Sequence, residues 1–173
     1  MRLVAAALAL SAATALGAPP LPPPVVAEYP GLRQLGEGTL RFLGLHVYDG
    51  SVWIPGEAYS ALGLFALELR YSMSVKGAEL ASQSVKEWKK QGMNDESKFK
   101  RWEAEMTRIF PDIKSGDRLV GVHVPGKGAA FYSAEKALGL VADPEFAQAF
   151  FGIWLAETTS EPKLRRQMLK LAN

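Results

Sequence analysis

The sequence predicts an α+β fold, in which an antiparallel sheet of about seven strands carries helices on one face. Apolar and polar side chains alternate over 64–71 and again over 119–124, which is typical of antiparallel strands. Apolar residues recur at steps of three and four over 80–88 and 99–110, which indicates amphipathic helices. The helices are grouped and do not alternate with strands, which argues against the βαβ pattern of a nucleotide-binding sheet.

Composition excludes several classes of protein. The 173 residues, 48% hydrophobic and 22% charged, suit one ordinary globular domain. The absence of Cys excludes disulfide scaffolds, thiolate nucleophiles and Cys-ligated zinc, and two His cannot build a multi-His metal site. We therefore expect no metal and no cofactor. With 20 basic against 18 acidic residues, the chain is not predicted to bind nucleic acid.

The N-terminus is typical of a secretory signal peptide over residues 1–17. Met1-Arg2 is followed by an uncharged Ala- and Leu-rich run over 3–16, and Ala15 and Gly17 are the small residues expected before a cleavage site. The run is shorter than the roughly 20 residues that span a bilayer. We therefore expect an exported protein, periplasmic or secreted, with no stable membrane insertion after cleavage. Residues 18–30, which include five Pro up to Glu28, are predicted to be an extended linker, and 31–173 the folded domain.

The first strands of that domain are expected over 39–54, where β-forming residues dominate. Asp49-Gly50 is a strong signal for a two-residue hairpin turn within this segment. Pro55-Gly56 closes the unit. The next strand, over 64–73, places Phe65, Leu67, Leu69 and Tyr71 on one face.

Helix boundaries in the second half have recognisable signals. Gln91-Gly92 supplies a stop for the helix that contains Trp88. After the helix over 99–110, three short strands form a meander over 119–141. Asp143-Pro144 combines a capping side chain with Pro at the first helical position, and Ser160-Glu161-Pro162 starts a final helix.

Two polar residues, Arg41 and Tyr48, stand out within the apolar β segment. A guanidinium group cannot lose its charge, so an inward-facing Arg41 needs an anion from the protein or from a ligand. The alternative is an ordinary surface arginine. His46 and His123 lie in apolar strands and are interpreted as structural residues.

Three stretches, over 36–53, 74–92 and 150–165, resemble the chalcone isomerase-like family, in particular its bacterial exported branch. The first runs from Gly36-Glu37-Gly38-Thr39-Leu40-Arg41 to a strand ending at Trp53, the second ends in Val85-Lys86-Glu87-Trp88-Lys89, and the third begins Phe150-Phe151-Gly152-Ile153-Trp154. Their order and spacing span residues 33–172. The resemblance implies an open-faced β-sandwich with a ligand cleft between sheet and helices.

The resemblance also implies three possible activities: ring closure of chalcones, fatty-acid binding through an Arg and a Tyr, or non-catalytic assistance of flavonoid synthesis. The family Arg corresponds to Arg41, although here it lies one residue later after Gly38 than in the plant enzymes. The position that is Thr in isomerases and Tyr in fatty-acid binders corresponds to Tyr48. The catalytic Tyr of the isomerases corresponds to Lys76 and their active-site Asn to Gln83, so their hydrogen-bond network is not reproduced.

We therefore expect an exported protein that binds a small apolar carboxylate, such as a fatty acid, through Arg41, Tyr48, Lys76 and Gln83. One alternative is an isomerase or intramolecular lyase acting on an enone-like substrate, and another is a non-catalytic structural or interaction protein. Arg41 and Tyr48 would lie on opposite faces of a continuous strand, so their convergence requires a bend, for which Gly44 is the candidate. The sequence leaves the oligomeric state open.

Overall fold

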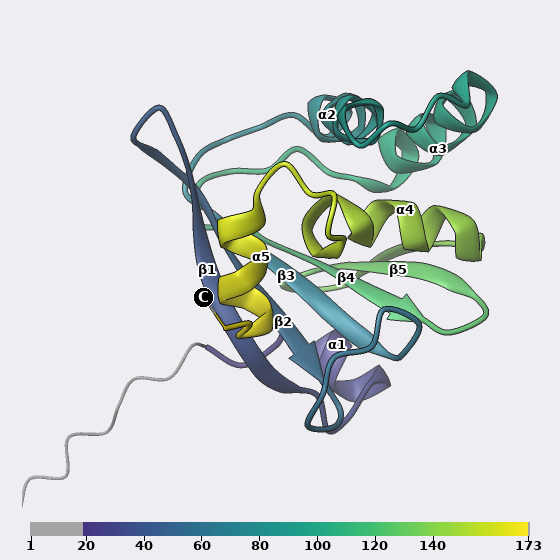
Figure 1. The fold of residues 1–173 in the computed structure, drawn as a ribbon. Coiled ribbons are helices and arrows are strands. Elements are labelled where there is room, and N and C mark those ends of the chain that lie inside the picture. Colours follow the sequence, from purple (N-terminus) through teal and green to yellow (C-terminus); the bar gives the residue numbers. More distant parts are fainter. Residues whose placement is uncertain (1–18, 173) are drawn as a thin grey trace, which may run out of the picture.

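A six-stranded antiparallel sheet forms the centre of the molecule (Figure 1). The computed structural model describes residues 19–172, and the predicted signal peptide lies outside the described residues. The strands lie side by side in chain order: β1 (Arg33–Phe42), β2 (Leu45–Ile54), β3 (Phe65–Tyr71), β4 (Arg118–Val124), β5 (Gly128–Ser133) and β6 (Ala137–Val141). This architecture confirms the predicted α+β class, with six strands where about seven were expected.

Four helices cover one face of the sheet, as predicted. They are α2 (Gly77–Lys90), α3 (Glu96–Ile109), α4 (Pro144–Leu155) and α5 (Pro162–Leu169). Figure 1 shows α4 and α5 next to the sheet, with α2 and α3 beyond α4. The predicted cap of α4 is present, because the Asp143 carboxylate accepts the backbone N–H groups of Glu145 and Phe146 at 2.9 and 3.1 Å. The predicted stop of α2 is also present, since Gly92 follows with φ +88°.

The space between sheet and helices is filled by aromatic side chains. Phe131 of β5 packs against Phe150 of α4 with ring centroids 5.0 Å apart. Farther from the sheet, the buried rings of Trp88 and Trp102 meet edge to face at 5.2 Å. Trp88 also donates its indole N–H to the carbonyl of Ala149 at 2.8 Å, which satisfies its one polar atom. The helices are therefore held by a continuous aromatic core.

The Pro-rich segment departs from the extended linker expected for residues 18–30. Residues Pro23–Glu28 form a short helix, α1, on the face of the sheet opposite to α4. Leu21 and Val25 are buried there in one cluster with Trp53. Tyr132 donates its hydroxyl to the Glu28 carboxylate at 2.5 Å. The segment is ordered because the second sheet face offers apolar surface, and the fixed φ of Pro suits the first turn of a helix.

A buried ion pair lies on the same face as α1. Glu68 of β3 is only 1% exposed, and its carboxylate accepts a hydrogen bond from the guanidinium group of Arg118 on β4. Ser51 of β2 adds a longer hydroxyl contact at 3.5 Å. Arg118 also donates to the backbone carbonyl of Pro20 at 2.6 Å. One arginine thus neutralises the buried carboxylate and fastens the N-terminal segment to the sheet.

The turn between β1 and β2 lies at Leu43-Gly44, so the predicted hairpin at Asp49-Gly50 is wrong. Leu43 and Gly44 both have positive φ, at 49° and 80°, as a type I′ hairpin turn requires. Asp49 and Gly50 instead lie within β2, paired on both sides. A Cβ on Gly50 would stand 2.9 Å from the sulfur of Met168, so packing against α5 explains this glycine better than a turn does.

Helix α5 rests directly on the glycines at the start of the domain. A Cβ on Gly36 would lie 2.6 Å from the backbone oxygens of both Gln167 and Met168. A Cβ on Gly38 would lie 2.8 Å from the side chain of Leu164. The Gly-x-Gly pattern is therefore a packing device that allows a helix to approach the strand, and it has no phosphate-binding geometry.

Candidate ligand-binding site

Two tyrosines lie side by side on the central sheet, near the end of β2 that follows the β1–β2 hairpin turn. Tyr48 of β2 and Tyr71 of β3 are cross-strand partners, and both are buried. Their rings meet edge to face with centroids 5.6 Å apart. Three half-buried apolar residues of the core surround this pair. Leu40 is the cross-strand partner of Tyr48, Val47 precedes it in β2, and Trp154 is hydrogen-bonded to it. Partly buried apolar side chains thus border the tyrosine pair.

The hydroxyl groups of these tyrosines retain donor capacity. Trp154 donates its indole N–H to the Tyr48 hydroxyl oxygen at 2.8 Å. Within residues 19–172, no protein atom accepts a hydrogen bond from the hydroxyl of Tyr48 or Tyr71. Burial raises the pKa of Tyr48 and of Tyr71 well above the ordinary tyrosine value. Both phenols therefore stay protonated at physiological pH and can donate to an acceptor that enters between the layers.

Negative charge lies on the helical side of this pair. Burial tends to raise the pKa of Glu87, but hydrogen bonds from Lys90, Ser160 and Gln83 outweigh it and hold the pKa below its usual value. Glu87 is thus a fixed carboxylate. Together with Glu161 it contributes to the raised pKa of Tyr48. An anionic group would consequently be repelled on that side of Tyr48.

Positive charge lies on the strand side, where Arg41 is the penultimate residue of β1. Because of the Leu43-Gly44 turn, Arg41 and Tyr48 belong to two adjacent antiparallel strands, and the expected problem of opposite faces on one strand does not arise. Leu40 is the cross-strand partner of Tyr48, and a register shift follows before Arg41 pairs with His46. Arg41 is exposed and forms no ion pair within the described part of the chain. Its guanidinium group is therefore free to meet an anion.

The other two sequence-predicted residues have protein partners. The Lys76 ammonium pairs with Asp112 at 2.9 Å, and this hydrogen bond raises the pKa of Lys76. The Gln83 amide donates to Glu87 at 2.9 Å. Both side chains are exposed; Lys76 is the N-cap residue of α2, and Gln83 lies within the helix. The strand register thus places Arg41 next to the cross-strand partner of Tyr48. Lys76 is held by Asp112, and Gln83 is bound to Glu87 on the helical side of the pair.

Sequence analysis missed Tyr71 and Trp154 as members of this group. It assigned Tyr71 to one face of a strand and named Trp154 within a stretch that carries the family resemblance. Neither residue carries a local signal for its contact with Tyr48, because one contact depends on strand pairing and the other joins residues 106 positions apart. His123 is structural, as expected: it is buried, stacks on Phe65 and contacts the Gly63 carbonyl through Nδ1 at 2.6 Å.

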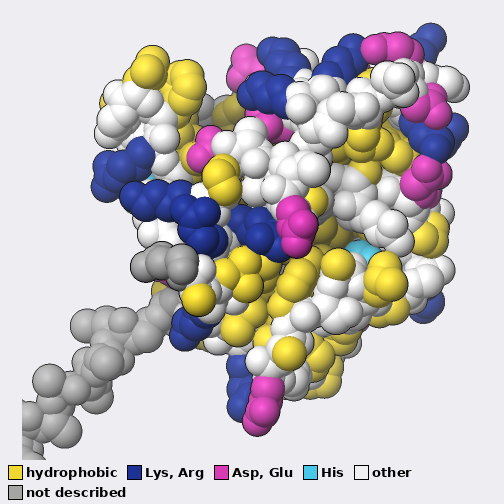
Figure 2. All heavy atoms as spheres, in the orientation of Figure 1, with side chains coloured by type: hydrophobic (Ala, Val, Ile, Leu, Met, Phe, Trp, Pro, Cys, Tyr) yellow, Lys and Arg dark blue, Asp and Glu magenta, His cyan; other side chains and the backbone are white. Residues whose placement is uncertain are grey.

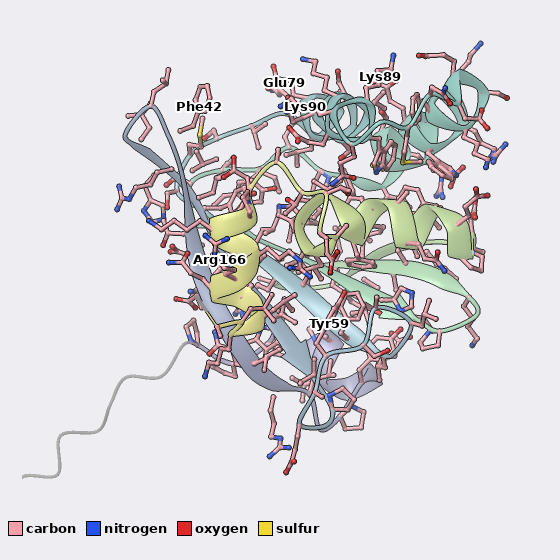
Figure 3. All side chains as sticks on the ribbon, viewed as in Figure 1. Phe42, Tyr59, Glu79, Lys89, Lys90 and Arg166 are labelled. Carbon is pink, nitrogen blue, oxygen red and sulfur yellow. The ribbon has the colours of Figure 1, made fainter. Side chains whose placement is uncertain are left out.

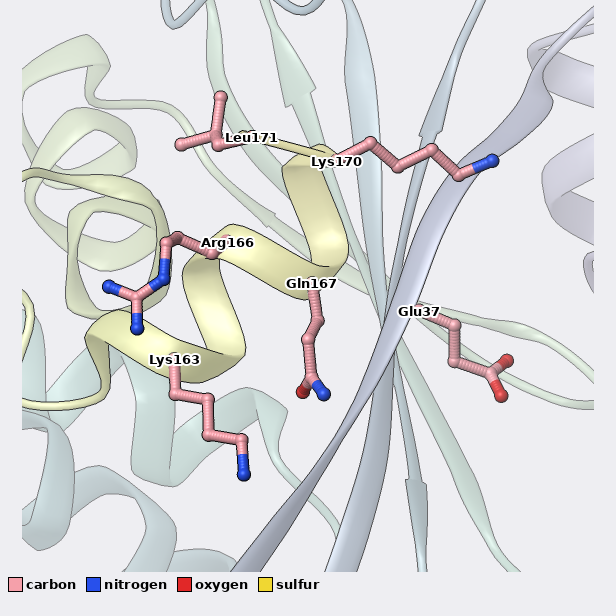
Figure 4. A pocket seen from close by; sticks show the side chains of 6 residues that line it. All are labelled: Glu37, Lys163, Arg166, Gln167, Lys170 and Leu171. Carbon is pink, nitrogen blue, oxygen red and sulfur yellow. The ribbon is translucent and has the colours of Figure 1, made fainter. Parts of the chain in front are cut away.

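A shallow surface hollow lies between α5 and β1, away from the tyrosine pair (Figure 4). It measures about 500 Å³ and is lined by Glu37, Lys163, Arg166, Gln167, Lys170 and Leu171. A smaller hollow of about 270 Å³ adjoins it along β1. Charged side chains line both hollows, so neither suits an apolar chain. The described residues contain no group of three or more His, Asp or Glu side chains that could hold a metal ion.

The comparisons with known proteins identify the family. A model of chalcone isomerase-like proteins matches residues 21–170. The chain belongs to the chalcone isomerase-like family. The matched region begins at Leu21, so it includes the segment that forms α1 on the second sheet face.

One curated relative and one solved structure are similar to this chain. An uncharacterized protein of Haemophilus influenzae is 31% identical over 130 residues, which cover 68% of this chain and 63% of the relative. The chain thus spans less than two thirds of the length of that curated relative. A fatty-acid binding protein of Arabidopsis thaliana has the same fold, with a TM-score of 0.61 at 13% identity over 81% of this chain and 87% of the plant protein. At that identity, the similarity shows the chalcone isomerase-like fold alone.

Proposed function

We propose that this chalcone isomerase-like protein binds a fatty-acid-like amphiphile at the Tyr48–Tyr71 pair and Arg41. One observation carries the proposal: the exposed Arg41, which has no ion-pair partner among the described residues, directly follows the cross-strand partner of Tyr48, and the hydroxyl groups of the buried Tyr48 and Tyr71 have no acceptor among those residues. A carboxylate accepts from both kinds of donor, and charge-assisted hydrogen bonds are the strong ones. The fatty-acid binding name of the plant protein with this fold supports the ligand class.

The charges set the orientation of the ligand. Glu87 and Glu161 repel an anion on the helical side of Tyr48, so the head group lies on the strand side, toward Arg41. The acyl chain then contacts the half-buried apolar residues of this end, Leu40, Val47 and Trp154. The aromatic core next to them supplies the apolar surface that a chain needs.

The same groups favour binding over acid–base catalysis. A general acid works best with a pKa near the operating pH, whereas burial raises the pKa of both phenols far above it. Lys76, the other candidate proton donor, stays charged in its pair with Asp112. Export to the periplasm or beyond remains part of the proposal and rests on the signal-like residues 1–17.

The first experiment is native mass spectrometry of the purified protein, followed by titration of the lipid-stripped protein with palmitate and with hexadecanol. Arg41→Gln should weaken palmitate binding by roughly ten- to a hundredfold, the range of a hydrogen bond to a charged group. Hexadecanol has no charge, so its affinity should change far less. Tyr48→Phe should weaken both ligands, because the phenol donates to either oxygen.

Two matched controls are available. Arg33 is another exposed arginine of β1 with no ion pair among the described residues, and Tyr59 is a half-buried tyrosine of the β2–β3 loop. Arg33→Gln and Tyr59→Phe should bind palmitate as the unmodified protein does. If Arg41→Gln and Arg33→Gln bind palmitate equally well, the assignment of the head-group site is wrong.

A further inference from the structure

The β1–β2 hairpin ends in an apolar tip. Phe42, Leu43 and Leu45 are 66, 88 and 67% exposed, although they are large hydrophobic residues. Figure 3 labels Phe42 at this end of the hairpin, and Figure 2 shows apolar side chains gathered there. Single exposed apolar residues are common on soluble proteins, but a cluster at one projecting point marks an interaction surface.

The turn itself argues that the apolar residue is there for an outside contact. Leu43 has φ 49°, in the left-handed region where a side chain with a Cβ is unfavourable. Two-residue type I′ turns favour Asn-Gly or Asp-Gly for this reason. Within the fold Leu43 gains nothing in return, since 88% of it remains exposed. Neither backbone preference nor core packing explains a leucine at this position.

Free positive charges flank the apolar tip. Arg41 directly precedes Phe42, and the exposed Lys163 and Arg166 lie on α5, which packs along β1. Lys170 follows the end of α5 and lies farther from the tip, beside Gln34 and Glu37. None of these four forms an ion pair within residues 19–172, whereas Lys89 and Lys90 of α2 are paired with carboxylates, the latter with Glu87. Figure 2 shows Lys and Arg side chains directly below the tip on the same edge.

We propose that this hairpin docks the protein on the surface of a bilayer that contains anionic lipids. An apolar tip with a cationic flank matches the order of layers in a membrane interface. The apolar side chains reach the acyl region, and the guanidinium and ammonium groups lie at the level of the phosphates. A second copy of the chain docked on the same edge would bring like charges together. This inference goes beyond the fatty-acid site, because it depends on Phe42, Leu43 and Leu45 and on no tyrosine hydroxyl.

Vesicle flotation tests the docking surface. The protein is mixed with phosphatidylcholine vesicles, with or without phosphatidylglycerol, in the absence of free fatty acid. Partitioning onto the mixed vesicles is expected, with weaker binding to phosphatidylcholine alone. Leu43→Asn should reduce partitioning roughly tenfold, the effect of losing most of one buried leucine. Because Asn suits a positive φ, this variant should fold at least as stably, which thermal unfolding checks.

Leu62→Asn is the matched control. Leu62 is 67% exposed in the β2–β3 loop, at the other end of β2 from the hairpin turn. The Leu62→Asn variant should partition onto vesicles as the unmodified protein does. Arg41→Gln should reduce partitioning onto the mixed vesicles about fivefold, the effect expected for one cation at an anionic surface. Its partitioning onto phosphatidylcholine alone should change little.

Several outcomes would overturn the proposal. They are the absence of vesicle binding, equal partitioning of Leu43→Asn and the unmodified protein, and an equal loss in Leu62→Asn. Sedimentation velocity adds another: a dimer that Leu43→Asn dissociates, without vesicle binding, would assign the tip to a second copy. Palmitate affinity in lipid-free buffer should be unchanged in Leu43→Asn, so failure of docking and failure of the fatty-acid site can be told apart.

Discussion

Replacement of Gly36 by Ala should loosen helix α5 from the sheet. The added methyl group would lie 2.6 Å from the backbone oxygens of Gln167 and Met168, well inside van der Waals contact. Backbone atoms cannot rotate away as a side chain can, so α5 itself must shift. That helix buries Leu164, Met168 and Leu169, each worth about 1.5–3 kcal/mol when fully buried. Overpacking of this kind typically costs about 1–3 kcal/mol, and we expect the upper end of that range.

Urea unfolding followed by circular dichroism measures the cost. A loss of about 3 kcal/mol should also lower Tm by roughly 6–12 °C in a domain of this size. Gly56→Ala is the control, because a Cβ there meets nothing within 4 Å and no positive φ is involved. It should change stability by less than about 0.5 kcal/mol. If Gly36→Ala is as stable as Gly56→Ala, close packing of α5 against Gly36 does not contribute to stability as argued.

Two further changes probe the ion pair and the helix cap. Arg118→Met should destabilise the fold by about 3 kcal/mol in denaturant unfolding, because it leaves the carboxylate of Glu68 buried without its cation. The double variant that also carries Glu68→Met should recover part of that loss. No recovery in the double variant would contradict the explanation. Burial tends to raise the pKa of Asp143, but hydrogen bonds from Trp102 and two backbone N–H groups lower it overall. The ionised carboxylate therefore adds to the free energy of unfolding above the unfolded-state pKa of about 3.9, and this stabilisation is lost as pH falls below that value. The free energy of unfolding should therefore fall less steeply with decreasing pH in Asp143→Asn than in the unmodified protein. An unchanged pH dependence would refute this role of Asp143.

Local patterns predicted most of the fold because most elements have strong local signals. The alternation over 64–71 and the capping residues at 143–144 correspond directly to β3 and α4. The hairpin was misplaced because Asp49-Gly50 is the stronger turn signal, while Leu is atypical at the positive φ that Leu43 adopts. Helix α1 was missed because its support comes from the distant strands of the second sheet face.

The candidate site was only partly predictable for the same physical reason. Arg41 and Tyr48 are conspicuous as polar residues in an apolar segment, and the turn brings their strands together. Tyr71 joins the group only through strand pairing, and Trp154 only through the packing of α4. A single sequence carries no direct record of such long-range contacts.

The two proposals share an edge of the molecule but rest on different atoms. Arg41 serves both, as the cation for a carboxylate and as the cation for a lipid phosphate, so its replacement alone cannot separate them. Leu43→Asn removes the apolar tip and leaves every hydroxyl in place. Tyr48→Phe removes a buried hydroxyl and leaves the tip unchanged. A loss of vesicle binding in the first variant, together with a loss of palmitate affinity in the second, would show that one end of the sheet both meets the bilayer and holds the ligand.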